Sequence, residues 1–252
     1  MTSNTLTPCT ETAIQGATAY NRITGKSMLK LLFDFVIAWL GLMILLPAIF
    51  AITVIVRLGS PGPVLFRQIR VGRGGRDFVL LKFRTMTSRS GSEKGDFDAG
   101  DGSRVTKFGR FLRATKLDEL PQLWNVIRGD MALVGPRPEV RKWVEVNPER
   151  WAIVHEVRPG ITDPAAIVYR DEEKILANVA EPELFYREQI LPRKLDLYVE
   201  YVKARTFWGD VKILGRTGIA LVTGAPADLQ ASSRRDVGIA EENEQRVEQQ
   251  KR

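Results

Sequence analysis

The residues best suited to chemistry are two adjacent carboxylates, Asp118 and Glu119, followed by Leu120 and Pro121. Proline fits the first turn of a helix, so the pair is predicted at a helix N-terminus, where the helix dipole stabilises ionised carboxylates. An ionised carboxylate can attack phosphorus and form an acyl phosphate, or it can bind a metal ion. The pair can equally do no more than cap a helix and complete its first turn, and both interpretations stay open at this point.

Four basic side chains near this pair in the sequence can supply positive charge: Lys82, Arg84, Arg113 and Arg137. A carboxylate that attacks a diphosphate approaches a group that is already negative. Mg²⁺ at the acidic pair, together with Lys and Arg side chains, would relieve this repulsion and stabilise the charge on the phosphoryl oxygens. These four residues are therefore candidate phosphate-binding groups.

Arg137 stands between two prolines, Pro136 and Pro138. Proline fixes the backbone dihedral φ, so the triplet holds the backbone around one guanidinium group rigidly. Such rigidity suits an arginine whose placement against a phosphate matters. A rigid loop end without a binding role is the alternative.

Short strands and helices are expected to position these side chains. Residues 64–66 and 78–83 flank a glycine-rich turn at 72–76 and predict a hairpin. Helical spacing predicts helices over 106–114, 118–127, 140–157 with an interruption at Asn147-Pro148, 183–204 and 207–222. The last two are amphipathic, and Trp208 suits a membrane interface. A Gly-, Ser- and Asp-rich loop at 88–103 lies between hairpin and helices. The pattern predicts a helix-rich α+β domain with a small sheet.

An apolar run at 35–56 precedes this domain and contains one proline, Pro47. Its length of about 22 residues suffices to cross a hydrocarbon core of about 30 Å as one helix. Basic residues stand at both ends, among them Lys30 and Arg57. Basic flanks favour the cytoplasmic side, so a helix kinked or broken at Pro47 that enters and leaves on one side satisfies both. A simple spanning anchor, and a buried core helix of a soluble protein, are the alternatives.

Composition narrows the chemistry. The 252-residue chain has one cysteine, one histidine and a net charge of +7. One cysteine allows no intrachain disulfide and one histidine disfavours His-rich metal chemistry, so His155 is interpreted as a helix-surface residue. Basic residues beside an apolar anchor favour anionic headgroups or phosphate-bearing substrates. The sequence shows no nucleic-acid-binding signature, and no nucleic-acid partner is expected.

Three motifs in this order resemble a known family. Leu-Asp-Glu-Leu-Pro-Gln at 117–122 is followed by Gly-Asp-Met at 129–131 and Gly-Pro-Arg-Pro at 135–138, with Lys-Phe-Arg at 82–84 upstream. The string is similar to that of the bacterial sugar transferases, the monotopic phosphoglycosyl transferases that begin glycoconjugate and exopolysaccharide assembly. The resemblance spans 26–222, including the apolar run with its proline.

The resemblance implies a Mg²⁺-dependent reaction in which sugar-1-phosphate passes from a UDP-sugar to undecaprenyl phosphate and UMP is released. Asp118 would attack the β-phosphate and carry the phosphosugar. Glu119 would help to hold the metal or accept a proton. The Pro-Arg-Pro element would lie near the nucleotide diphosphate, and Arg158 would contact phosphate or uridine.

The resemblance also implies a location. The apolar run would be a re-entrant helix broken at Pro47, with membrane lipids around it. The enzyme would sit in the bacterial inner membrane with its catalytic domain on the cytoplasmic face. The chain is expected to divide into four segments: a disordered N-terminal segment at 1–25, the membrane helix at 26–58, the catalytic domain at 59–224 and a charged, disordered tail at 225–252. A homodimer is left open.

This chain departs from many relatives at two places. Leu46 precedes Pro47 where many have serine, and Asp163-Pro164-Ala165-Ala166 follows Pro-Gly-Ile-Thr where many have Gly-Trp-Ala-Gln-Val. The second departure leaves the identity of the sugar open. A membrane scaffold that binds anionic lipid through its basic face is the rival without catalysis.

Overall fold

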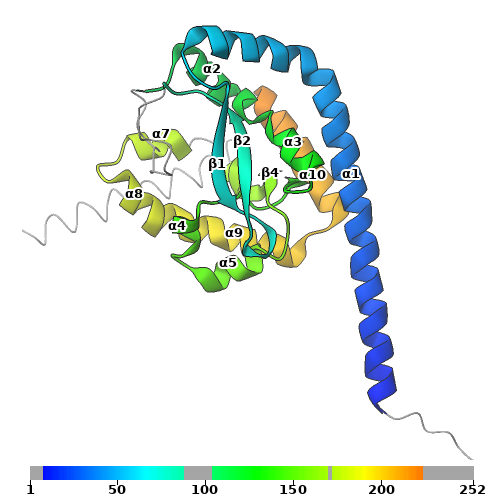
Figure 1. The fold of residues 1–252 in the computed structure, drawn as a ribbon. Helices are drawn as coiled ribbons and strands as arrows, with labels where there is room; N and C mark the ends of the chain where they lie inside the picture. The colour runs from blue at the N-terminus through cyan, green and yellow to red at the C-terminus, as the bar shows by residue number, and fades with distance from the viewer. Residues whose placement is uncertain (1–7, 88–103, 170–171, 224–252) are drawn as a thin grey trace, which may run out of the picture.

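A computed structural model describes residues 8–87, 104–169 and 172–223 and gives a helix-rich α+β fold (Figure 1). In chain order the elements are α1 (Pro8–Gly59), β1 (Leu65–Val71), a 3₁₀ turn (Arg73–Gly75), β2 (Asp77–Phe83), α2 (Lys107–Thr115), a second 3₁₀ turn (Leu117–Glu119), α3 (Gln122–Ile127), β3 (Ala132–Val134), α4 (Arg141–Val144), α5 (Pro148–Val154), β4 (Gly160–Thr162), α6 (Pro164–Val168), α7 (Glu172–Ala177), α8 (Pro182–Phe185), a π turn (Tyr186–Ile190), α9 (Leu191–Ala204) and α10 (Phe207–Thr223). The expected 88–103 loop and 225–252 tail lie outside the described residues. The four-segment division stays a prediction.

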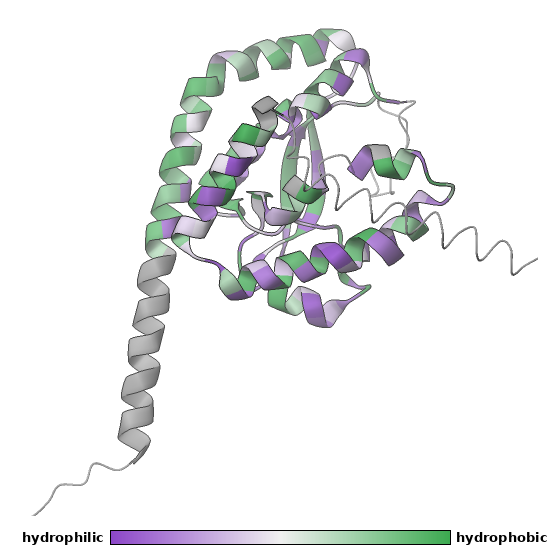
Figure 2. Cartoon of the chain, turned by 180° about the vertical axis from the view of Figure 1, so that it is seen from behind, coloured by the Kyte–Doolittle hydropathy of each residue, from purple (hydrophilic) through white to green (hydrophobic). Residues whose placement is uncertain are grey.

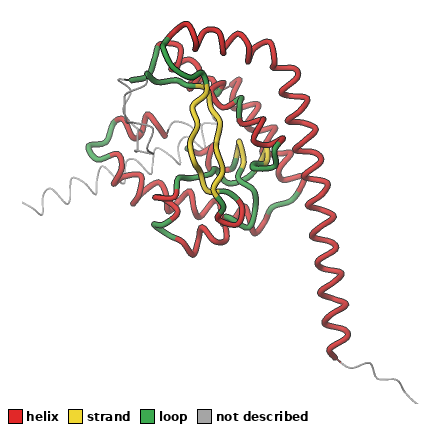
Figure 3. The backbone as a smooth tube through the Cα atoms, in the orientation of Figure 1, coloured by secondary structure: helices red, strands yellow, loops and turns green. Residues whose placement is uncertain are grey.

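The hairpin is confirmed and is longer than expected. Strands β1 and β2 pair antiparallel from Leu65↔Phe83 to Val71↔Asp77, and they run through the middle of the domain (Figure 3). Gly74 and Gly75 have φ of 67° and 72° in the turn. This left-handed region favours glycine, so the Gly-rich sequence directs the chain reversal here.

The sequence did not predict the second sheet, in which β3 and β4 pair parallel with Ala132 opposite Gly160. The strands approach very closely where they end. A Cβ on Gly160 would lie 2.1 Å from the nitrogen of Gly135, so only glycine fits. Parallel strands end at the same edge, so this pairing brings Arg137, after β3, and Asp163, after β4, to one side of the domain.

Helix α1 lies along one side of the domain and then bends across its top (Figure 1). Pro47 lies inside α1, which remains one helix. Its ring removes a backbone donor and clashes with the carbonyl four residues earlier, which favours such a bend. Ala38, before the proline, packs in the core with α3 and β3, whereas Ile52 and Val56 pack with Phe83 and Leu112. The helix begins at Pro8, inside the stretch that the sequence left without structure.

In the part of the chain that the structure describes, the segment Met28–Gly59 is the one helix long and apolar enough to cross a membrane, and 11% of its most apolar window is buried. Ile44, Phe50 and Leu58 are 74%, 70% and 82% exposed. Figure 2 shows the same helix as a largely hydrophobic ribbon at the edge of the domain. A core helix of a soluble protein would be mostly buried, so this exposure favours a membrane segment.

Polar contacts fix α1 to the domain that follows it. Lys30 pairs with Asp210 of α10 and donates to the carbonyl of Val134 at 3.2 Å. Asp34, buried in the helix, accepts from Arg158 Nη2 at 3.1 Å. Tyr201 donates to Asp210 Oδ1 at 2.7 Å. Partnered in this way, the buried charges dock the apolar helix in one orientation.

The remaining helices pack around a separate core. Trp151 of α5 and Tyr198 of α9 are both buried there, with side chains from α4 and from α6 to α8. The helix expected over 183–204 is continuous but contains the π turn between α8 and α9. His155 ends α5 half-buried and stacks on Trp151, so it is less exposed than the sequence suggested.

Candidate active site

The acidic pair lies in a tight turn rather than in the first turn of a helix. Helix α2 ends at Thr115 and is followed by Lys116, whose φ of 58° is the one positive value at a non-glycine residue among those described. Asp118 and Glu119 follow in the 3₁₀ turn, and α3 begins only at Gln122, with Pro121 at its N-cap position. The predicted helix from Asp118 is therefore wrong at its start: the left-handed Lys116 separates α2 from the turn, and the donorless Pro121 lies between the turn and α3. With α3 this short, neighbouring side chains rather than a helix dipole set the charge of the pair.

Glu119 is held by two cations. Arg137 Nη2 lies 2.6 Å from Glu119 Oε1 and Nη1 lies 3.4 Å from Oε2, while Lys82 Nζ lies 3.3 Å from Oε1. Burial by itself would raise the pKa of Glu119, but Arg137 and then Lys82 outweigh it and hold the pKa well below the ordinary value. The same contact raises the pKa of Arg137 well above its usual range. Glu119 is therefore ionised at neutral pH.

Asp118 is buried, and its Oδ1 atom has no hydrogen-bond partner among the described residues. Burial raises the pKa of Asp118, and Lys82 partly offsets this rise. A buried carboxylate oxygen without a donor is uncommon and calls for an explanation. Its freedom suits a nucleophile or a ligand that meets its partner only when substrate binds.

Asn125, which the sequence analysis did not single out as a site residue, positions the pair. Its Oδ1 accepts from the amide of Leu81 at 3.1 Å, and its Nδ2 donates to the carbonyl of Val79 at 2.8 Å. The side chain thus bonds the edge of β2 as a neighbouring strand would. This contact fixes α3 against β2 and places Lys82 opposite Glu119. An amide in the apolar stretch Leu-Trp-Asn-Val-Ile was the available signal.

Of the five predicted phosphate-binding residues, Lys82 and Arg137 meet the acidic pair and the other three have partners elsewhere. Arg84 donates to the carbonyl of Ser60 at 2.7 Å, just after α1. Arg113 donates to Thr85 Oγ1 at 2.9 Å and forms an ion pair with Glu173. Arg158 forms an ion pair with Asp34.

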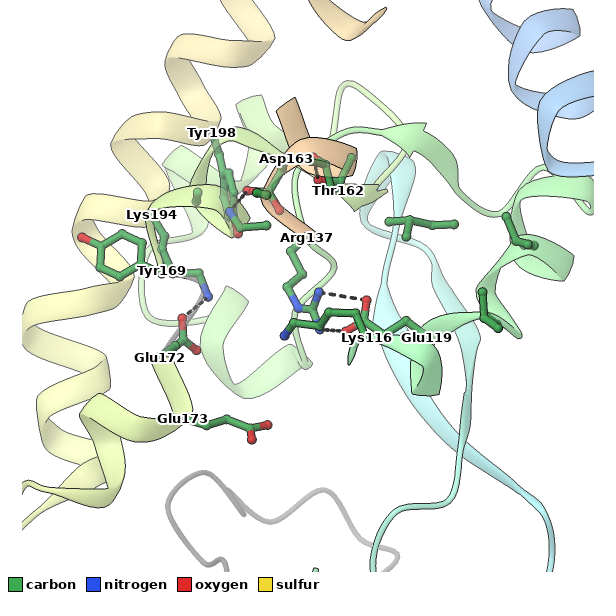
Figure 4. A pocket seen from close by; sticks show the side chains of 17 residues that line it. Lys116, Glu119, Arg137, Thr162, Asp163, Tyr169, Glu172, Glu173, Lys194 and Tyr198 are labelled. Carbon is green, nitrogen blue, oxygen red and sulfur yellow. Dashed lines mark hydrogen bonds and ion pairs between the residues drawn. The ribbon is translucent and has the colours of Figure 1, made fainter. Parts of the chain in front are cut away.

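A cavity of about 300 Å³ opens beside the acidic pair (Figure 4). Its lining residues are Lys116, Glu119, Leu120, Leu123, Arg137, Ile161, Thr162, Asp163, Ala165, Ala166, Tyr169, Glu172, Glu173, Lys194, Tyr198, Thr217 and Ala220. In Figure 4, Lys116 and Glu119 lie on one side, Lys194 and Tyr198 on the other, and Arg137 between them. Asp118 does not line the cavity itself, but its neighbour Glu119 does.

The described residues contain no group of three or more His, Cys, Asp or Glu side chains able to hold a metal ion. Mg²⁺ often binds through one or two carboxylates and the phosphates of a substrate. The unpartnered Oδ1 of Asp118 fits such a site. Glu119, expected as a second ligand, has both oxygens bonded to cations.

The structure thus combines a candidate membrane helix, whose apolar side chains are exposed, with a domain whose buried carboxylates, two basic side chains and cavity form an enzyme-like site for an anionic ligand. Residues 25–224 match the family model of the bacterial sugar transferases, and the chain belongs to this family.

Named relatives agree with this assignment. The chain is 38% identical over 198 residues to a UDP-glucose:undecaprenyl-phosphate glucose-1-phosphate transferase of Caulobacter vibrioides, covering 77% of this chain and 70% of the relative. It is 35% identical over 194 residues to a UDP-N-acetylgalactosamine-undecaprenyl-phosphate N-acetylgalactosaminephosphotransferase of Aeromonas hydrophila, covering 76% of this chain and 43% of the relative. It is 41% identical over 187 residues to the uncharacterized sugar transferase EpsL of Bacillus subtilis, covering 74% and 84%. The chain thus spans less than half of some relatives and most of others.

Proposed function

We propose that the protein transfers a sugar-1-phosphate from a UDP-sugar to undecaprenyl phosphate through a phosphosugar covalently bound to Asp118, releasing UMP. The observation that carries the proposal is the buried, unpartnered Oδ1 of Asp118 beside the cation-bound Glu119. The reactions named for the Caulobacter and Aeromonas relatives support the substrate classes.

In the first step, a carboxylate oxygen of Asp118 bonds to the β-phosphorus of the donor. The bond from that phosphorus to the bridging oxygen breaks, and UMP leaves with the bridging oxygen and its electrons. The charge that develops on the phosphoryl oxygens needs nearby cations. Lys82 and Arg137 supply them, since each already lies against the neighbouring carboxylate at 3.3 Å and 2.6 Å.

In the second step, an oxygen of undecaprenyl phosphate bonds to the same phosphorus. The bond to Asp118 breaks, and the free carboxylate returns. Glu119 holds the two cations in place through both steps; its low pKa makes it a poor proton acceptor. Mg²⁺, with Asp118 and the donor phosphates as ligands, would neutralise phosphate charge in this site.

The membrane segment brings the lipid substrate to this site. We propose that α1 enters the cytoplasmic leaflet of the bacterial inner membrane, bends at Pro47 and returns, with lipid contacting its exposed side chains. Trp208, 71% exposed at the start of α10, extends this apolar surface at headgroup depth. A polyprenyl chain held in the bilayer then presents its phosphate where the catalytic domain binds the donor.

The covalent mechanism is tested by Asp118→Asn. Donor without acceptor should leave the mass of a phosphosugar on the wild-type peptide that contains Asp118, and no added mass on the variant. UMP release should fall by at least a thousandfold, while the melting temperature in nanodiscs stays at or above that of wild type because a buried carboxylate is removed. Substantial turnover by the variant would refute the mechanism.

The topology is tested with the single native cysteine, Cys9. A membrane-impermeant maleimide should label neither Cys9 nor a cysteine placed at Arg76 in intact spheroplasts, and should label both after lysis. Labelling of one site alone in intact spheroplasts would mean that α1 spans the bilayer.

A further inference from the structure

Two buried polar groups in the cavity are left without partners. Asp163 and Tyr198 are both 0% exposed and both line the cavity. Among the described residues, Asp163 Oδ2 and the hydroxyl of Tyr198 have no hydrogen-bond partner. A buried polar atom without a partner has lost its hydrogen bonds to water and destabilises the fold. Two of them in one cavity point to a ligand that satisfies both.

The other carboxylate oxygen of Asp163 already has a hydrogen-bond partner. Its Oδ1 accepts from the amide of Ala166 at 2.8 Å and caps α6. This bond holds the side chain in place and leaves Oδ2 as the free acceptor. The Asp163-Pro164 sequence therefore builds a fixed carboxylate at the cavity wall.

Neighbouring polar residues of the cavity are satisfied within the protein. Thr162 and Thr217 bond each other at 2.8 Å, and Lys194 donates to Glu172 at 3.1 Å. Asp163 and Tyr198 thus differ from the other polar side chains around them. Figure 4 shows these two side chains next to each other, above Arg137.

The chemistry of the pair identifies the ligand class. A carboxylate oxygen accepts hydrogen bonds and repels phosphate, while a phenol hydroxyl both donates and accepts. The wall beside them is small and apolar, at Ala165 and Ala166. Such a surface fits a neutral ring that carries hydroxyl groups, packed by one face and hydrogen-bonded at its edge.

Position distinguishes the donor sugar from the nucleoside. Arg137 and Asp163 follow the paired strands β3 and β4, so they share one edge of this sheet. If Arg137 binds the phosphate under attack, the group attached directly to that phosphate lies nearest to Asp163. In a UDP-sugar this group is the sugar, and the nucleoside is one phosphate further away.

We propose that Asp163 and Tyr198 form the donor-sugar subsite, in which Asp163 Oδ2 and the Tyr198 hydroxyl bind sugar hydroxyl groups and select among UDP-sugars. The proposal rests on the proposed function. It assigns the choice of sugar to side chains that no step of the phosphoryl transfer uses.

The test compares Asp163→Asn and Tyr198→Phe with wild type and with Asp196→Asn, a carboxylate-to-amide change at an exposed position of the same helix as Tyr198. UMP release is measured with UDP-glucose, UDP-galactose, UDP-N-acetylglucosamine and UDP-N-acetylgalactosamine, and UMP is used as a competitive inhibitor. We expect kcat/KM for the preferred donor to fall about 10- to 100-fold in both site variants. The ratio between epimeric donors should shrink, the Ki of UMP should stay within twofold, and Asp196→Asn should behave as wild type.

Each other outcome has a distinct meaning. An equal loss of UMP affinity would place the nucleoside at the pair and overturn the proposal. Wild-type donor preference in both variants would also overturn it. If wild type releases UMP from none of the UDP-sugars, the proposed function itself fails. This result is seen in wild type alone, so it is distinct from any difference between wild type and the variants.

Discussion

Arg137 contacts both carboxylate oxygens of Glu119, with Nη2 2.6 Å from Oε1 and Nη1 3.4 Å from Oε2. The prolines at 136 and 138 hold the backbone that carries this guanidinium. A lysine cannot form such a two-point contact. Arg137→Lys should therefore lower kcat/KM for UMP release about 10- to 100-fold, as expected for the loss of one charge-assisted hydrogen bond. Arg141→Lys, which changes an exposed pair with Asp77, is the matched control and should change kcat/KM less than twofold. Equal effects of the two variants would contradict the role of Arg137.

The depressed pKa of Glu119 predicts a pH dependence of stability. Burial opposes the ionised form, but Arg137 and Lys82 outweigh burial, so the folded pKa lies below the unfolded one. The stabilisation is present above the unfolded value of 4.5 and is lost as pH falls through the folded pKa. Glu119→Gln should destabilise the protein by about 3 kcal/mol at pH 7, because it leaves two cations without their anion. This deficit should shrink toward pH 3 in denaturant melts. A deficit that does not change with pH would show that the ion pair is not its source.

The hydrogen bonds of Asn125 should couple the position of the β1–β2 hairpin to that of the acidic turn. Asn125→Ala removes the partners of the Leu81 amide and the Val79 carbonyl, which should destabilise the fold by about 3 kcal/mol. Because Lys82 then loses its fixed place, kcat should fall while the Ki of UMP changes little. Asn125→Asp keeps an acceptor for Leu81 but loses the donor to Val79 and Asp130 and buries a carboxylate beside both acceptors, so it should destabilise the fold at least as much as Asn125→Ala. If Asn125→Ala were as stable as wild type, α3 would be positioned by apolar packing alone.

The sequence identified the parts of the site that act through residue type and near neighbours. The acidic pair, Arg137 between its prolines and the Gly-rich hairpin turn are all local patterns. Contacts between residues far apart in the sequence could not be predicted from it. Arg84 is a candidate phosphate-binding residue because it is basic, and Arg158 is a candidate contact of phosphate or uridine because of the family resemblance. Neither pattern shows that their partners are Ser60 and Asp34, which lie 24 and 124 residues away in sequence. Which cation meets which anion depends on tertiary packing, and packing is not encoded in a short window.

Strands β3 and β4 escaped detection for a related reason. Each has three residues, too few to show the alternation that marks a strand, and all three residues of β3 are buried. Their glycines were visible in the motifs Gly-Pro-Arg-Pro and Pro-Gly-Ile-Thr. Without knowing that Gly135 and Gly160 face each other, the sequence could not show that the two motifs form one structure.

The close approach of those two glycines gives a direct test. A methyl group on Gly160 would meet the Gly135 nitrogen at 2.1 Å and its oxygen at 2.4 Å, so the strands must separate. Gly160→Ala should destabilise the protein by more than about 3 kcal/mol and abolish UMP release, since Arg137 and Asp163 both move. Gly215→Ala is the matched control, because nothing lies within 4 Å of its added Cβ in α10. Helix propensity should make this control neutral or more stable by up to about 1 kcal/mol.

Replacing the buried carboxylate of Asp163 should make the protein more stable at high pH, even though it removes a proposed binding group. Burial raises its pKa from the ordinary 3.8 to about 6, with the amide of Ala166 as the largest opposing influence. A raised pKa means that the neutral form favours the fold: this stabilisation is complete below 3.8 and is lost as pH rises through about 6. The shift corresponds to about 3 kcal/mol above pH 7. Asp163→Asn should therefore be more stable than wild type by up to that amount at pH 8, and no more stable at pH 4, in melts of nanodisc-embedded protein.

Donor binding should change the difference in stability between Asp163→Asn and wild type in a way that burial of the carboxylate alone does not explain. If the free Oδ2 of Asp163 accepts a hydroxyl of the sugar, saturating UDP-sugar raises the melting temperature of wild type more than that of Asp163→Asn. The stability gap at pH 8 should then narrow with the preferred UDP-sugar and stay open with UMP, which carries no such ring. A gap that narrows equally with both ligands would mean that the nucleotide alone satisfies or displaces the carboxylate. A gap that neither ligand changes would leave Asp163 as a cap of α6 that carries an unfavourable buried charge for no gain in binding.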